Sequence, residues 1–193
     1  MRYNQWGRLF YKLRWYHEDF VLMLLPFYFG GNMRKFERIS FKQFKKDVCD
    51  SRELYDKIEL PSRSTKNSAG YDIRSIENVI IKPGESKAIK TGVKVSMNSD
   101  EVLYIFDRSS LGFKYDICLS NSVGVIDSDF YNNPDNEGHF QVKLINHGKN
   151  DFEVHIGDRI AQGVFMKYLV VDDEKEIEST RKGGIGSTNK EGK

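Results

Sequence analysis

The chain has 193 residues and a formal net charge of +2, from 30 Lys and Arg against 28 Asp and Glu. Hydrophobic residues make up 39% and charged residues 30%, which excludes a disordered or fibrous protein and indicates a soluble globular chain with one main core. The near-neutral charge excludes a polybasic nucleic-acid-binding protein. Two cysteines, Cys49 and Cys118, lie too far apart to suggest a zinc cluster or a disulfide scaffold, which favours a reducing compartment such as the cytoplasm.

Residues 1–32 differ in composition from the rest, since they hold ten of the 25 aromatic residues and both tryptophans. Their apolar run at 20–29 is interrupted by Pro26 and falls well short of the roughly 20 residues of a transmembrane helix, so no membrane span is expected. Adjoining acidic residues and the lack of a cleavage site argue against a signal peptide. We interpret this extension as a peripheral arm or as upstream sequence outside the natural product; the fresh start at Met33 favours the latter.

A short helical lead-in is expected over 33–54. Residues 40–48 predict a helix because Ser40 can cap its N-terminus and three apolar side chains then recur on one helical face.

From residue 55 to residue 171 the pattern changes to short β-type runs separated by turn residues. Pro83 and Gly84 stand at the positions that a tight turn favours. Many short strands without a long helical pattern between them predict an all-β barrel or sandwich. The predicted runs are 79–82, 87–97, 102–106, 117–119, 123–126, 140–145, 152–156 and 160–171. Residues 172–193 are acidic and then glycine-rich, which predicts a mobile C-terminal arm.

Polar groups between these runs suggest chemistry, although each segment is weak evidence alone. Arg108 with Ser109 and Ser110 directly follows an apolar run, and this combination suits a phosphate cradle. Asp127 ends an apolar hairpin-like segment, and Asp72 lies inside a strand pattern. The histidines have no metal-ligand spacing and are interpreted as strand residues.

The order of five segments resembles the ordered motifs of the trimeric dUTPase family, from about residue 62 to residue 189. They are Ala-Gly-Tyr-Asp-Ile (69–73), Arg-Ser-Ser-Leu-Gly (108–112), Gly-Val-Ile-Asp (124–127), Gly-Asp-Arg-Ile-Ala-Gln (157–162) and Gly-Gly-Ile-Gly-Ser-Thr (183–188). The resemblance implies a jelly-roll-like β-barrel and a homotrimer whose active sites lie between subunits. It also implies hydrolysis of dUTP to dUMP and pyrophosphate with Mg²⁺, which limits uracil incorporation into DNA and supplies dUMP for dTMP synthesis.

The resemblance further implies a role for each matching position. Asp127 matches the acid that activates the attacking water and contacts the deoxyribose 3′-hydroxyl. The positions matching uracil and deoxyribose contacts are Asn121, Gly124, Ile126, Phe130 and Ile185. The positions matching phosphate ligands are Arg108, Ser109, Ser110, Gln162, Arg181, Gly186 and Ser187. Asp72 matches the acid that holds metal-bound waters, and Asp158 and Arg159 match groups that brace the site from behind.

The chain departs from the family pattern at four of these positions. Phe130 stands where the family usually has a tyrosine under the sugar, so the ring face is kept and a hydroxyl contact is lost. Ile185 replaces the usual phenylalanine of the arm and cannot stack on uracil, which predicts weaker closure and a raised KM. Ser110 stands where glycine is common, and Arg181 lies one residue closer to the glycine pair than the usual arm arginine.

Two other functions stay open from the sequence. The related dCTP deaminases share the fold and an Arg-Ser-Ser stretch, but they lack the glycine-rich arm. A regulator that changes shape on binding dUTP would use the segments without an assigned role, which are 1–32 and the polar loop 132–138.

Overall fold

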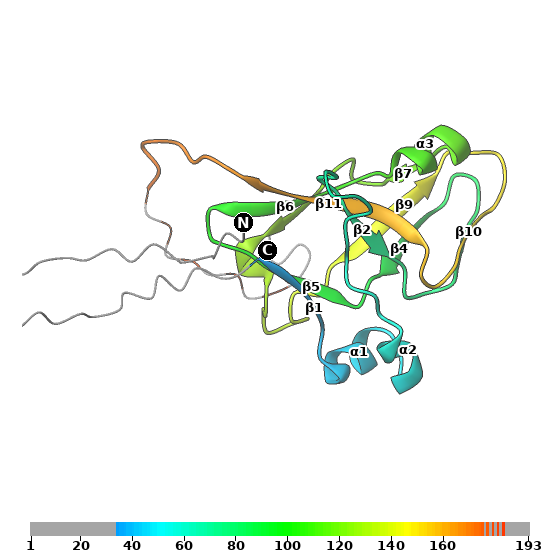
Figure 1. Ribbon diagram of the computed structural model, residues 1–193, viewed down its shortest axis with the longest axis horizontal. Coiled ribbons are helices and arrows are strands. Elements are labelled where there is room, and N and C mark those ends of the chain that lie inside the picture. The colour runs from blue at the N-terminus through cyan, green and yellow to red at the C-terminus, as the bar shows by residue number, and fades with distance from the viewer. Residues whose placement is uncertain (1–33, 176, 178, 180, 182, 184–193) are drawn as a thin grey trace, which may run out of the picture. The chain divides into compact units, whose positions relative to one another are not determined.

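A computed structural model describes residues 34–175 together with residues 177, 179, 181 and 183. Short antiparallel strands dominate this part of the chain, which confirms the all-β expectation (Figure 1). In chain order the elements are β1 (Lys35–Arg38), α1 (Phe41–Asp47), α2 (Arg52–Asp56), β2 (Tyr71–Arg74), β3 (Val79–Ile81), β4 (Ser86–Lys90), β5 (Val93–Ser96), β6 (Glu101–Phe106), α3 (Ser109–Tyr115), β7 (Ile117–Leu119), β8 (Gly124–Asp127), the 3₁₀ turn η1 (Ser128–Phe130), β9 (Gln141–Asn146), β10 (Phe152–Val154) and β11 (Arg159–Lys167).

The described strands form a four-stranded sheet in the order β2-β11-β6-β8, a three-stranded sheet β4-β9-β7, and the pairs β1-β5 and β10-β3. All pairings are antiparallel. Strand β11 is central to the largest sheet because it pairs with β2 on one side and with β6 on the other. The helices α1 and α2 contact each other beside the β1–β5 pair (Figure 1).

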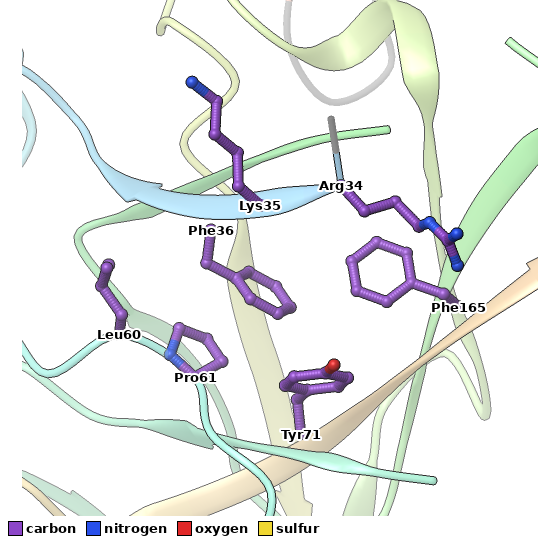
Figure 2. Close-up of a pocket in the computed structure, with 7 residues that line it drawn as sticks. All are labelled: Arg34, Lys35, Phe36, Leu60, Pro61, Tyr71 and Phe165. Atoms are coloured by element: carbon purple, nitrogen blue, oxygen red, sulfur yellow. The ribbon is translucent and has the colours of Figure 1, made fainter. Parts of the chain in front are cut away.

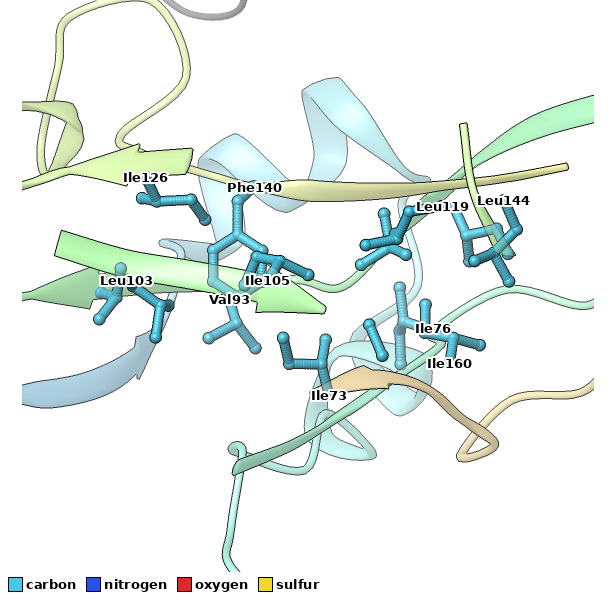
Figure 3. Packing of buried hydrophobic residues seen from close by; sticks show 14 of the residues in the cluster. Ile73, Ile76, Val93, Leu103, Ile105, Leu119, Ile126, Phe140, Leu144 and Ile160 are labelled. Carbon is cyan, nitrogen blue, oxygen red and sulfur yellow. The ribbon is translucent and has the colours of Figure 1, made fainter. Parts of the chain in front are cut away.

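A single cluster of buried apolar side chains joins these sheets. Figure 3 shows isoleucine, leucine, valine and phenylalanine side chains from several strands meeting between the ribbons. Fully buried members include Ile73 on β2, Leu103 on β6 and Leu144 on β9. Burial of a side chain of this size stabilises the fold by about 1.5–3 kcal/mol. The core therefore stabilises the strands that carry the polar site residues.

The predicted helix and turn are confirmed. The hydroxyl of Ser40 accepts a hydrogen bond from the Gln43 N–H at 3.1 Å and so caps α1. Gly84 has φ +77°, and the Glu85 N–H donates to the Lys82 carbonyl at 2.9 Å, which closes the turn before β4.

The structure corrects three expectations about element limits. The predicted run 87–97 is two strands in different sheets, because the chain turns at Gly92 (φ +70°). A Cβ at Gly92 would lie 2.7 Å from Ile58 Cδ1, so the core leaves no room for a larger residue there. The last predicted strand ends at Lys167 rather than at 171. The segment after Arg108 forms the helix α3, which was not predicted. No helix in the described part of the chain has the length and apolar character needed to cross a membrane.

Candidate functional site

Strand register brings three of the predicted site residues to one end of the largest sheet. Gln162 on β11 lies opposite Asp72 on β2 and opposite Phe106 on β6. Arg108 follows Phe106 by two residues and therefore emerges beside the same point. Residues that are up to 90 positions apart in the sequence thus become neighbours through antiparallel pairing alone.

Asp72 forms the centre of an ionic cluster at this point. Its Oδ1 accepts from Arg108 Nε at 3.1 Å, and its Oδ2 accepts from Arg159 Nη1 at 3.2 Å and from the Ser64 hydroxyl at 2.6 Å. Burial acts to raise the pKa of Asp72, but the bonds from Ser64 and the two guanidinium groups outweigh it and hold that pKa below its ordinary value. One carboxylate and two guanidinium groups leave the cluster with a charge of about +1, which suits an anionic ligand.

A cavity of about 450 Å³ opens next to this cluster and is lined by Asp107, Arg108, Ser109, Gly112, Phe113 and Gln162. The Gln162 amide donates to the Asp107 carbonyl at 2.8 Å, and its oxygen lies where a Cβ on Gly70 would approach to 2.5 Å. Glycine at position 70 is therefore what allows Gln162 to take this position. Ser109 and Ser110 are the first two residues of α3 and directly follow Arg108, and Ser109 lines the cavity.

Asp127 lies at the other end of the sheet, as the last residue of β8. Arg181 donates to Asp127 Oδ2 at 2.5 Å and to Asp129 Oδ1 at 2.9 Å. Its guanidinium carbon also lies 5.6 Å from the centre of the Phe130 ring. The Asp127 side chain is 50% exposed, so this carboxylate can reach a ligand or a water molecule.

The connection between β7 and β8 contains the predicted base-binding positions. It is not the expected hairpin, because β7 pairs with β9 and β8 pairs with β6 in a different sheet. The Asn121 amide donates to the Val123 carbonyl at 3.2 Å, and Ser122 adopts φ +61° at the tip. A Cβ at Gly124 would lie 3.0 Å from the Cβ of Ile105, so glycine lets the start of β8 lie close to β6. Ile126 is buried and anchors the strand that ends in Asp127.

The two groups of polar residues are well separated within one chain. Asp127 pairs in register with Val102, whereas Gln162 pairs with Phe106 at the far end of the same strand β6. Four residues of extended strand span about 13 Å. A general base has to lie within about 3 Å of the proton that it removes, or one water further away. The carboxylate of one chain is therefore not adjacent to that chain's cationic cluster.

The described residues include no group of three or more His, Cys, Asp or Glu side chains that could hold a metal ion. Asp72 can still serve Mg²⁺ indirectly. Its Oδ1 accepts one bond, from Arg108, and a carboxylate oxygen has room for a second, such as one from a metal-bound water. Mg²⁺ typically keeps several waters and is held through substrate phosphates and one or two carboxylates. The donor set thus fits an ion that arrives with a phosphate ligand.

The structure brings together Asp72, Arg108, Ser109, Arg159 and Gln162 at one end of the sheet. Ser110 is the second residue of α3 and does not line the cavity, and Asp127, Phe130 and Arg181 meet at the other end. The carboxylate of Asp158 instead accepts from the His155 N–H at 2.8 Å, inside the turn that precedes β11. The expected roles of Ile185, Gly186 and Ser187 concern residues outside the described part of the chain.

Two further residues belong to these clusters and were missed. Ser64 donates to Asp72 from a serine-rich loop that gave no distinguishing signal in the sequence. Asp129 shares Arg181 with Asp127, and its position two residues after a candidate base could have suggested this.

Comparisons with known proteins show which family this chain is similar to. A family model described as dUTPase matches residues 56–189. The deoxyuridine 5′-triphosphate nucleotidohydrolase of Lactococcus lactis subsp. lactis (strain IL1403) is 52% identical over 132 residues, which is 68% of this chain and 88% of that protein. The protein of the same name from Nautilia profundicola is 38% identical over 143 residues, covering 72% of this chain and 96% of that protein.

Solved structures show the same likeness. The crystal structure of dUTPase from Streptococcus mutans matches with a TM-score of 0.61 and 42% identity, over 72% of this chain and 99% of that one. A mutant dUTPase from phage phi11 of S. aureus, described with a structural Mg(II) ion, matches with a TM-score of 0.56 over 76% of this chain and 97% of that one. At 21% identity, the second match supports the fold alone.

Proposed function

Because this chain belongs to the dUTPase family and is thereby a nucleotide hydrolase that acts on dUTP, we propose a division of roles among its residues. Asp127 serves as the general base, and the cluster of Asp72, Arg108 and Arg159 with Gln162 receives the phosphates. The observation that carries this proposal is the pair of polar groups at the two ends of β6, one with an accessible carboxylate and the other cationic.

The proposed chemistry is an in-line attack of water on the α-phosphorus. Asp127 accepts a proton from the water as its oxygen forms a bond to phosphorus, and the bond to the bridging oxygen of the β-phosphate breaks. The products are dUMP and pyrophosphate. Anionic oxygens around the phosphorus repel a nucleophile, so Arg108 and Gln162 have to bind and orient the phosphate chain. A positioned base contributes about 10²–10⁴-fold to such a step.

We also propose that Mg²⁺ enters with the triphosphate. Its chemistry, when bound, is to neutralise phosphate charge. Asp72 would hold the ion through water rather than directly, since both of its oxygens already accept from arginines. Although burial opposes it, the hydrogen bond from Ser64 together with the guanidinium groups of Arg159 and Arg108 keeps Asp72 ionised, as its lowered pKa indicates.

The nucleoside is proposed to bind near Asp127 and Phe130. The Phe130 ring would face the deoxyribose and leave no space for a 2′-hydroxyl. The connection between β7 and β8, with Asn121 and Gly124, would read uracil through its backbone and amide groups. In support, the guanidinium of Arg181 lies over the Phe130 ring and on Asp127.

We further propose a homotrimer with shared sites, and the geometry of the single chain supports sharing between copies. In one chain Asp127 is about 13 Å along β6 from the position of Gln162. A site that needs both requires two copies of the chain, with the base from one and the phosphate cluster from its neighbour. Exposed apolar side chains such as Leu169 (96% exposed) and Val171 (65% exposed) are available for contacts between copies.

A pyrophosphate-release panel over dUTP, UTP, dTTP, dCTP and dUDP tests the proposal, with ammonia release from dCTP measured in parallel. We expect pyrophosphate from dUTP in strong preference, and loss of turnover in Asp127→Asn. Ammonia from dCTP would instead establish a deaminase. A wild-type enzyme without preference for dUTP, or an active Asp127→Asn variant, would refute the assignment.

A further inference from the structure

Residues 131–139 lie between Phe130 and Phe140, the residue before β9, and their own side chains fold them into a tight loop. The Asn133 amide donates to the Phe130 carbonyl and to Asn136 Oδ1, both at 2.8 Å, while its oxygen accepts from the Asp135 and Asn136 N–H groups. Asn133 is only 4% exposed, so these bonds have little competition from water. The loop therefore holds the backbone of Phe130 directly.

Gly138 packs this loop against the same carbonyl. A Cβ at this position would lie 2.7 Å from the Phe130 oxygen and 3.0 Å from Tyr131 Cα. Because the two backbone segments pack this closely, the backbone of Phe130 cannot move toward the loop.

Glu137 joins the loop to the lead-in helix α1. Its carboxylate accepts from the Ser40 N–H at 2.8 Å and from the Ser40 hydroxyl at 2.5 Å. Lys94 on β5 bonds Asn132 Oδ1 at 2.7 Å and lies 3.5 Å from Glu137. Burial acts to raise the pKa of Glu137, but Ser40 and Lys94 outweigh it and hold that pKa below its ordinary value. Glu137 is thus charged at neutral pH, and its bonds to Ser40 are of the strong, charge-assisted kind.

Two more contacts run between the loop and the lead-in. The Tyr131 hydroxyl donates to Glu37 on β1. His139 is fully buried, where its Nε2 accepts from the Gly92 N–H at 3.0 Å and its Nδ1 lies 2.8 Å from Asp47 on α1. Because Nε2 accepts, the proton of the neutral ring is on Nδ1 and is donated to Asp47. Glu37, Ser40 and Asp47 are each more than 90 residues away from their partners in the loop.

The lead-in is itself fixed to the core. Phe36 of β1 packs against Tyr71 and Phe165, with ring centres 5.4 and 5.5 Å away. Figure 2 shows these three rings gathered around a cavity of about 520 Å³. Ile39 and Phe44 have no exposed surface. A loop attached to β1 and α1 is therefore attached to a rigid support.

We propose that Glu137 and Ser40 are positioning residues for sugar discrimination, because they hold the 131–139 loop, and with it Phe130, against the deoxyribose. This inference rests on the proposed role of Phe130. An apolar wall rejects an added hydroxyl by about a hundredfold. If the loop is loosened, the Phe130 ring can move away from the sugar, and the enzyme should lose part of its discrimination against a 2′-hydroxyl. Asp127 and the phosphate cluster are left in place.

The test compares kcat/KM for dUTP with kcat/KM for UTP in one enzyme preparation, so that any loss of folded protein cancels in the ratio. Ser40→Ala removes a helix cap and a bond to Glu137. Ser51→Ala is its matched control, because Ser51 caps α2 by accepting from the Leu54 N–H at 3.2 Å. We expect Ser40→Ala to lower the ratio about tenfold and Ser51→Ala to leave it within about twofold.

Two further variants make the inference specific. Ser40→Thr keeps the hydroxyl and should keep the wild-type ratio. Glu137→Gln removes the charge that strengthens the bonds from Ser40, so it should lower the ratio as Ser40→Ala does. The double variant should lower it no further, because both changes weaken the same contact. Wild-type ratios in Ser40→Ala and Glu137→Gln, or an equal loss in Ser51→Ala, would overturn the inference. A wild-type enzyme without preference for dUTP over UTP would instead overturn the proposed function.

Discussion

Replacing Gly138 by alanine tests whether close backbone packing holds the 131–139 loop. Gly138 has φ +84° and lies where a Cβ would be 2.7 Å from the Phe130 carbonyl oxygen. Gly84 is the matched control, since it has a similar φ of +77° and nothing within 4 Å of its Cβ position. Both variants introduce a left-handed alanine, but only Gly138→Ala introduces a steric clash.

The expected losses follow from these two terms. A left-handed conformation costs a non-glycine residue about 1 kcal/mol, part of which is offset because alanine restricts the unfolded chain. Gly84→Ala should therefore lower the free energy of unfolding by about 1 kcal/mol or less. Overpacking against the backbone adds about 1–3 kcal/mol. Gly138→Ala should lose about 2–4 kcal/mol in total.

Urea denaturation measures both variants at one fixed protein concentration, because assembly would otherwise alter the apparent stability. In thermal melts, each kcal/mol corresponds to about 2–4 °C in Tm for a chain of this size. Equal losses in the two variants would show that packing against Phe130 contributes nothing, and would refute the reasoning.

Three further predictions concern the site and its ionisation. Asp127→Asn should lower kcat by about a hundredfold or more in a pyrophosphate-release assay, with the far-ultraviolet circular dichroism unchanged; wild-type turnover would exclude Asp127 as the base. Burial lowers the pKa of His139 and outweighs the opposing effect of Asp47. Below a pH of about 6.5 the unfolded chain therefore takes up a proton that the folded chain does not bind, and the free energy of unfolding falls. Urea melts from pH 7.5 to about 5.5 should show this slope in the wild type and in the control His147→Gln, and a flatter profile in His139→Gln; a slope that persists in His139→Gln would contradict the assignment. Calorimetry should detect Mg²⁺ binding only with a non-hydrolysable dUTP analogue present, and Asp72→Asn should weaken it; tight binding to the free protein would show a direct metal site.

Local signals in the sequence were enough for the features that depend on neighbouring residues. Ser40 predicted the cap of α1, and Pro83 with Gly84 predicted the turn before β4; both are confirmed. The order of the five motifs predicted the family, which the match over residues 56–189 confirms. The cap and the turn are short-range signals, and each motif is formed by consecutive residues, so no knowledge of the tertiary structure was needed.

Features that depend on distant pairing could not be predicted in the same way. The meeting of Asp72 with Arg108 and Arg159 requires the register of β11 against both β2 and β6. The break at Gly92 depends on Ile58, which fills the space that a Cβ would need. The helix α3 has only seven residues, too few for a clear amphipathic period.

The polar loop shows a further limit of the sequence. Residues 132–138 had no assigned role, because their contacts are made with Ser40, Lys94 and their own backbone rather than with a recognisable motif. The histidines were interpreted as strand residues, yet His139 lies in the loop before β9 and bonds Asp47.

The separation of Asp127 from the Arg108 cluster along β6 has a genetic consequence. In the proposed trimer a subunit that lacks its base still offers its phosphate cluster to a neighbour, and a subunit that lacks Arg108 still offers its base. Asp127→Asn and Arg108→Ala chains, each inactive alone, would then complement each other when co-expressed. In a mixed trimer, some sites would combine Asp127 from the Arg108→Ala chain with Arg108 from the Asp127→Asn chain. A substitution in one subunit would therefore not inactivate every site of the trimer.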